Sequence, residues 1–171
     1  MKQKMTTQKL AQMAMLVAMA TAVHWLESMM MPIFPGLPGV KLGLANLFTL
    51  YALQTLGASA AWTIAILRCG LGLLLIGAPV GAIYAFAGAM ISCLVMVVLK
   101  TLKFGPLAQS VMGALAHNTA QGMMAMVMTG TRGLIYYFPI LWLAAVPTGL
   151  FVGLVCIAMQ KAMKGKKDDR G

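Results

Sequence analysis

Residues 59–78 read SAAWTIAILRCGLGLLLIGA, an apolar run interrupted by one charged residue, Arg68. A transmembrane helix needs roughly 20 mostly apolar residues, so this stretch predicts a membrane-spanning helix. Gly57 precedes the run, Gly77 lies at its end and Pro79 follows it, as is typical of turns between helices. An ionisable side chain in the middle of a span is costly and marks a cavity, a partner or a functional site. This stretch therefore indicates both a fold class and a first residue of functional interest.

The apolar pattern continues on both sides of this run. We predict six membrane-spanning helices, at residues 9–30, 41–57, 59–78, 80–99, 105–130 and 133–160. Of the whole chain, 61% is hydrophobic and 9% is charged. Soluble domains average about 45–50% apolar and about 25% charged residues, so a soluble surface is excluded. The sequence predicts an all-α integral membrane protein with one transmembrane domain over residues 9–160.

The distribution of charge predicts the orientation of the helices. Lys and Arg number 13 against three Asp and Glu, and ten of these basic residues lie in segments 1–9, 100–103 and 161–171. Short cytoplasmic loops collect Lys and Arg. We therefore expect both termini to be cytoplasmic, with residues 1–8 and a basic tail, 161–171, flanking a domain in the plasma membrane. Membrane topology explains the excess of positive charge better than nucleic acid does, so we expect membrane lipid and no nucleic acid as partners.

A polar face on the fifth predicted span indicates a ligand site. Ser110, Gly113, His117 and Gln121 are three, four and four positions apart, so they share one helical face, and Asn118 lies beside it. Such a face favours a lined cavity, with hydrogen bonds between helices as the alternative. His117 has no second metal ligand four positions on. We therefore expect no metal and no cofactor.

Two further polar residues belong to the predicted site. Lys41 opens the second span, and Asn46 lies about 7 Å deeper, at a rise of about 1.5 Å per residue. Glu27 is the one acid outside the C-terminal tail, so Arg68 either binds an anionic ligand or pairs with Glu27 and backbone carbonyls. The excess of cations favours a small, anionic or strongly polar ligand. The predicted substrate-binding residues are Lys41, Asn46, Arg68, His117, Asn118 and Gln121.

The acidic residues argue against a self-sufficient enzyme. Chemistry on diphosphates needs carboxylates that hold Mg²⁺. Here Asp168 and Asp169 are neighbours in the predicted tail, and Glu27 is alone. The sequence also has no G-x-x-x-x-G-K-[ST] motif for nucleotide phosphates. We therefore expect no catalytic residues.

Small residues mark one face of the first predicted span. Ala11, Ala14, Ala18 and Ala22 are three, four and four positions apart. Small side chains on one face let a second helix approach closely. Such a face serves either packing within the bundle or a partner subunit.

Residues 38–46, PGVKLGLAN, resemble the signature of the Gx transporter family, also known as heptaprenyl diphosphate synthase component I. The resemblance covers roughly residues 8–160. It is supported by the six-span layout, by the region around Arg68 and by the polar face of the fifth span. That family in turn resembles the S components of energy-coupling factor transporters, which are six-helix membrane proteins that bind substrate.

This resemblance implies an S-component-like bundle and specific partners. In S components an A-x-x-x-A motif on the first helix docks on a transmembrane coupling subunit, and separate ATPase subunits supply energy. Ala14 and Ala18 match that motif, and segment 31–40 corresponds to the loop that covers the pocket. The implied function is import of an anionic micronutrient or an isoprenoid- or flavin-like precursor. Two alternatives stay open: a membrane component of heptaprenyl diphosphate synthesis, which would make the chain a polyprenyl diphosphate synthase component, and a subunit of a membrane redox or flavin complex.

Overall fold

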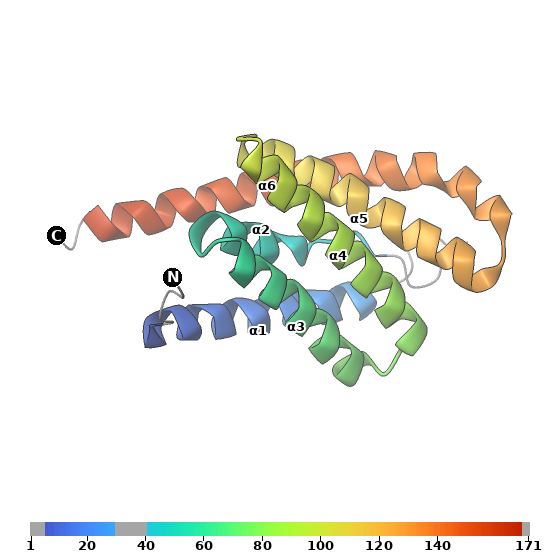
Figure 1. Ribbon diagram of the computed structural model, residues 1–171, viewed down its shortest axis with the longest axis horizontal. Coiled ribbons are helices and arrows are strands. Elements are labelled where there is room, and N and C mark those ends of the chain that lie inside the picture. The colour runs from blue at the N-terminus through green and yellow to red at the C-terminus, as the bar shows by residue number, and fades with distance from the viewer. Residues whose placement is uncertain (1–5, 30–40, 169–171) are drawn as a thin grey trace.

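The computed structural model describes residues 6–29 and 41–168, and in these ranges the chain forms helices and no strands. The elements are α1 (Thr7–Met29), α2 (Asn46–Thr55), α3 (Ala58–Ile76), α4 (Pro79–Thr101), α5 (Pro106–Thr129), the 3₁₀ helix η1 (Arg132–Tyr137) and α6 (Phe138–Asp168). Helices α1 and α6 run along the long axis of the molecule, and α5 lies oblique to it (Figure 1). Segment 31–40, which the sequence predicts to cover the pocket, lies outside the described residues.

Proline and glycine set the limits of the middle helices. Pro79 and Pro106 begin α4 and α5, at a position where the missing N–H of proline has no helical partner. Gly77 and Gly130 end α3 and α5 in the left-handed conformation that glycine adopts without strain. The predicted limits of these three helices are therefore correct to within two residues.

The second helix is shorter than predicted, and its predicted start at residue 41 is wrong. Helix α2 begins at Asn46, because Gly43 has a φ of 82° that is incompatible with a right-handed helix. The Leu44 N–H donates instead to Glu27 Oε1 at 2.8 Å. Ten helical residues rise about 15 Å, which is half of the roughly 30 Å hydrocarbon core of a bilayer.

The last helix is longer than predicted. The sequence predicts a span over 133–160 followed by a tail from residue 161. Instead, η1 precedes α6, and α6 continues to Asp168. Residue 160 is therefore not a helix end, and most of the predicted tail extends the helix.

Four helical segments in the described part of the chain are long and apolar enough to cross a membrane, and they are Thr7–Met29, Ala58–Ile76, Pro79–Thr101 and Arg132–Met163. Large apolar side chains on these helices face outward, as Leu74 does at 79% exposure. Helix α5 has 24 residues, enough to span, but its buried polar face lowers its mean hydropathy. The chain is a membrane protein built from helices.

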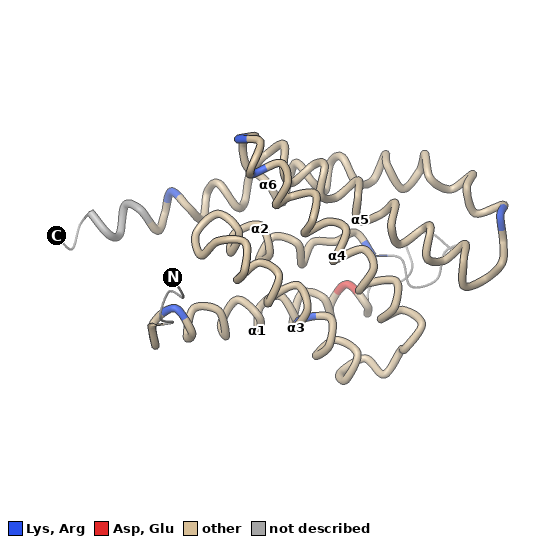
Figure 2. Tube along the Cα trace, in the orientation of Figure 1, with Lys and Arg blue, Asp and Glu red and all other residues tan. Residues whose placement is uncertain are grey.

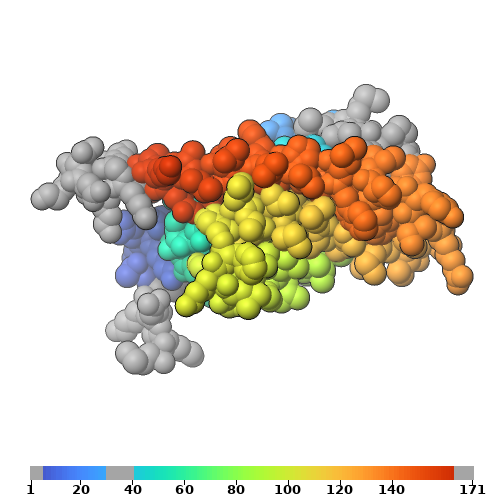
Figure 3. All heavy atoms as spheres, turned by 90° about the horizontal axis from the view of Figure 1, so that it is seen from above, coloured from blue at the N-terminus to red at the C-terminus, as the bar shows by residue number. Residues whose placement is uncertain are grey.

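Helix α2 lies at the centre of the bundle. It contacts α1, α3, α4, α5 and α6, and seven of its ten residues are buried. Around it, α1 packs against α3, α3 against α4, α4 against α5, and α5 against α6. Figure 3 shows α6, in orange and red, extending along one face beside α5, in yellow. This arrangement holds Asn46, the first residue of α2, inside the bundle.

Candidate functional site

A buried arginine anchors a polar cluster inside the bundle. Arg68, in the middle of α3, is 2% exposed. Its Nη2 donates a hydrogen bond of 2.6 Å to Asn46 Oδ1. The sequence left Glu27 and backbone carbonyls as possible internal partners of the guanidinium. In the structure its partner is instead the side-chain amide of Asn46 on α2.

Lys41 connects this cluster to α1 and α5. Its backbone N–H donates to Gln121 Oε1 at 3.0 Å. Its Nζ lies 3.1 Å from His24 Nε2 and donates to Ser28 Oγ at 2.5 Å. The half-buried Lys41 therefore holds the segment before α2 against two helices that are distant in sequence.

The polar face of α5 closes the cluster on its other side. His117 and Gln121 are buried, and Gln121 Nε2 lies 3.0 Å from His117 Nε2. A Cβ added at Gly43 would lie 3.1 Å from both Asn46 Nδ2 and His117 Cδ2, so these two side chains meet at this glycine. Five of the six predicted binding residues therefore lie in one connected cluster.

Asn118 is the predicted site residue that lies apart from this cluster. It is 1% exposed, and its Nδ2 donates to the Leu141 carbonyl of α6 at 3.0 Å. In this position the side chain joins two helices. Its neighbour His117 faces the cluster, because adjacent residues of a helix point in different directions.

Helix α1 contributes residues that the predicted site omitted. His24, Glu27 and Ser28 are spaced i, i+3 and i+4, so they share one face. His24 and Ser28 contact Lys41, and Glu27 accepts the Leu44 N–H. The helical spacing of three polar residues near the end of an apolar span was the signal available in the sequence.

Several buried polar atoms of the cluster have no hydrogen-bond partner among the described residues. They are Asn46 Nδ2, Arg68 Nε and His117 Nδ1, and the buried Ser92 Oγ and Ser110 Oγ also lack a partner within the described ranges. A cavity of about 10 Å³, close to the size of one water, borders Asn46 and Ser110. The sequence predicts a lined cavity at the polar face of the fifth span, and in this arrangement the cavity beside Asn46 and Ser110 has room for about one water.

Residues 16–159 match the family described as heptaprenyl diphosphate synthase component I. The chain belongs to this family. Among curated proteins, none matches the chain in sequence.

This family member has the fold of a known transporter subunit. The chain is similar to a solved protein described as the S component of a bacterial ECF transporter, with a TM-score of 0.65 and 16% sequence identity. The match covers 91% of this chain and 97% of that one. The polar cluster of this component I family member therefore lies within an S-component-like bundle.

The small-residue face of α1 points out of the bundle. Ala11, Ala14, Ala18 and Ala22 are all exposed, while their neighbours Leu16 and Ala20 are buried against the core. In this family member the predicted docking pair, Ala14 and Ala18, is accessible to another helix.

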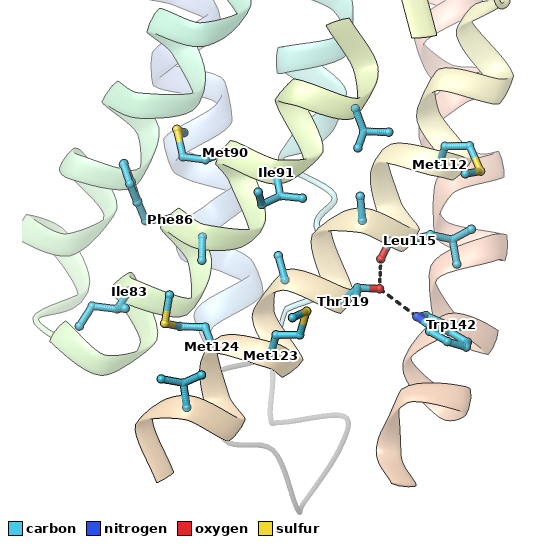
Figure 4. A pocket seen from close by; sticks show the side chains of 15 residues that line it. Ile83, Phe86, Met90, Ile91, Met112, Leu115, Thr119, Met123, Met124 and Trp142 are labelled. Atoms are coloured by element: carbon cyan, nitrogen blue, oxygen red, sulfur yellow. Dashed lines mark hydrogen bonds between the residues drawn. The ribbon is translucent and has the colours of Figure 1, made fainter. Parts of the chain in front are cut away.

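A separate, apolar groove lies on the outer side of α4, α5 and α6, as Figure 4 shows. It measures about 1040 Å³, and Phe86, Met90, Met123 and Trp142 are among its lining residues. Thr119 donates to the Leu115 carbonyl and accepts a hydrogen bond of 2.9 Å from Trp142 Nε1. Its apolar lining suits hydrocarbon, whereas the interior cluster suits a polar ligand.

Proposed function

We propose that this protein is the substrate-binding S component of an ECF-type importer, and that its substrate is a small anionic micronutrient or a precursor related to isoprenoids or flavins. The interior polar cluster carries this proposal. The cluster holds two cations, Lys41 and Arg68, and one carboxylate, Glu27, in a region where uncompensated charge is costly. Buried cations with atoms left to donate favour a ligand that brings negative charge.

Each cluster residue has a role in this proposal. Arg68 and Lys41 meet the anionic groups of the substrate, and Asn46, His117 and Gln121 supply hydrogen bonds. Arg68 Nε and Asn46 Nδ2 are buried donors without a partner among the described residues, so the substrate satisfies them. A substrate larger than one water requires the segment at Lys41 to move away from α5 and exchange its contacts with Gln121 for contacts with the ligand.

The topology and the partners complete the proposal. All six helices of residues 9–160 sit in the membrane, with residues 1–8 and 161–171 on the cytoplasmic side. The exposed Ala14 and Ala18 face docks on a transmembrane coupling subunit, and separate ATPase subunits hydrolyse ATP. Charge supports this orientation, because Figure 2 shows basic positions gathered at the end where α1 begins and α4 ends.

The test is purification of the protein from cells in mild detergent, followed by native mass spectrometry. We expect one small anionic molecule per chain. Arg68→Gln removes the buried charge and should weaken binding by about thirtyfold or more, because breaking a buried charged contact costs about 2–5 kcal/mol. Arg132→Gln is the matched control, since Arg132 is exposed on η1, outside the cluster. An empty wild-type chain, or equal loss in both variants, would contradict the proposal.

The family description favours a second candidate, a membrane component of polyprenyl diphosphate synthesis. The acids of the chain argue against catalysis by the chain itself, because Glu27 is the single carboxylate of the interior cluster and it accepts a backbone N–H. The discriminating assay supplies farnesyl and isopentenyl diphosphates to membranes with and without this chain. Polyprenyl product that depends on the chain would favour this candidate over the importer.

A further inference from the structure

Basic positions gather at one end of the bundle (Figure 2). A groove with two parts opens at this end. The first part measures about 580 Å³ and the second about 500 Å³, each within the range of about 300–1,000 Å³ typical of ligand pockets. Four residues border both parts, and they are Gln12, Gln54, Thr55 and Leu56. The two parts therefore adjoin, and together they lie between α1, α2, α4 and α6.

The first part of the groove is polar and positively charged. Lys9 and Lys100 line it, together with Thr6, Gln8 and other polar residues, and none of the lining residues is acidic. Lys100 Nζ donates to the Leu53 carbonyl, and an ammonium group has three N–H bonds, so two remain for a ligand. Gln8 and Lys9 in the first turn of α1 border this space, as does Gly57, the residue before α3.

The second part of the groove is mixed and more apolar. Met15, Leu16, Tyr51 and Met163 line it, beside the side chains of Gln12 and Gln160. Methionine side chains adapt to flexible hydrocarbon. The groove thus places a cationic compartment next to an apolar one, at the end of a membrane-embedded bundle.

We propose that this groove binds an anionic phospholipid. The phosphate group lies between Lys9 and Lys100, and one acyl chain lies along Met15, Leu16 and Met163. Charge complementarity selects the occupant, because basic pockets between helices at a membrane surface attract anionic headgroups. The site is separate from the interior cluster, so the proposal stands whether or not the protein is an importer subunit.

The experiment measures binding of phosphatidylglycerol in mixed micelles, with phosphatidylcholine and glycerol 3-phosphate as separate probes. We expect about one phosphatidylglycerol per chain, little binding of phosphatidylcholine, and weak binding of glycerol 3-phosphate, which lacks the chains. The double variant Lys9→Gln/Lys100→Gln should weaken phosphatidylglycerol binding by about thirtyfold. Lys9→Gln alone, which leaves the Lys100 contact with Leu53 intact, should weaken it by about fivefold.

The matched control is the double variant Lys103→Gln/Lys161→Gln. It removes the same charge from the same end of the molecule, but neither residue lines the groove. We expect it to bind phosphatidylglycerol like the wild type. Equal loss in both double variants, equal binding of phosphatidylcholine, or glycerol 3-phosphate binding as tight as the lipid would overturn the proposal. The proposal would also be overturned if the Lys9→Gln/Lys100→Gln variant bound lipid like the wild type but lost a coupling subunit in pull-downs.

Discussion

The packing of Gly72 against His24 yields the sharpest prediction. Gly72 lies on the buried face of α3, and a Cβ added there would lie 2.5 Å from His24 Cδ2 and 2.9 Å from His24 Nε2. Ordinary contact begins at 3.4 Å, so the closest atom is about 0.9 Å too near. The ring cannot move away without leaving Lys41, whose Nζ is 3.1 Å from Nε2. The variant Gly72→Ala therefore perturbs the cluster as well as the packing.

The expected change in stability of Gly72→Ala combines two opposing effects. Adding a methyl group to a tightly packed interior costs about 1–3 kcal/mol. Replacing glycine by alanine inside a helix gains about 0.5–1 kcal/mol. Gly70 isolates that gain, because it lies two residues away on the exposed face of α3 with no atom within 4 Å of its added Cβ. We expect Gly72→Ala to be less stable than Gly70→Ala by about 1–3 kcal/mol.

The assay is thermal unfolding of both variants and the wild type in the same detergent. The expected difference between the two variants is roughly 2–10 °C in unfolding midpoint for a chain of this size. Adding His24→Ala to Gly72→Ala removes the clash, so the double variant should lose less stability than the two single changes sum to. A midpoint for Gly72→Ala equal to or above that of Gly70→Ala would refute the reasoning.

Three further predictions concern the cluster and the outer face of α1. Gly88→Ala would place a Cβ 2.8 Å from His117 Cε1, so we expect it to lower the amount of co-purified ligand in native mass spectrometry. Gly81→Ala is the control: the nearest neighbour of its Cβ would be 3.9 Å away, so it should not lower that amount. Asn118→Ala removes the hydrogen bond to the Leu141 carbonyl and should lower stability by about 0.5–1.5 kcal/mol in thermal unfolding, with unchanged ligand affinity; a large loss of affinity would instead place Asn118 in the site. Ala14→Leu should abolish pull-down of a coupling subunit without lowering the unfolding midpoint, because Ala14 is exposed, and retained pull-down would contradict the docking role.

Helix limits were predictable wherever proline or glycine had one structural meaning. Pro79 and Pro106 each follow a turn and precede an apolar run, so they mark helix starts, whereas Pro147 lies inside α6. Gly77 ends an apolar run of full span length. Gly43 was not predictable, because glycine occurs both inside membrane helices and in left-handed turns. Its positive φ, which moves the start of α2 to Asn46, depends on the contact between Leu44 and a carboxylate of α1.

The members of the polar cluster were largely predictable, and their contacts were not. Polar residues at membrane depth are few, so Arg68, His117 and Gln121 stand out in the sequence. His117 faces the cluster and Asn118 faces α6. Helical geometry alone indicates this difference, because neighbouring residues of a helix point in different directions. The choice of Asn46 over Glu27 as partner of Arg68 depends on how α2 sits between the other helices. No pattern within one segment encodes that placement.

The short helix α2 connects two distant regions of the protein, the interior polar cluster and the basic groove. Its first residue, Asn46, holds the guanidinium in the interior, and Gln54 and Thr55 in its last turn border the basic groove about 15 Å away. A helix this short shifts as a rigid rod, since its backbone hydrogen bonds resist stretching. A displacement of one end of α2 would therefore be carried to its other end, which links the interior cluster to the groove through one short helix.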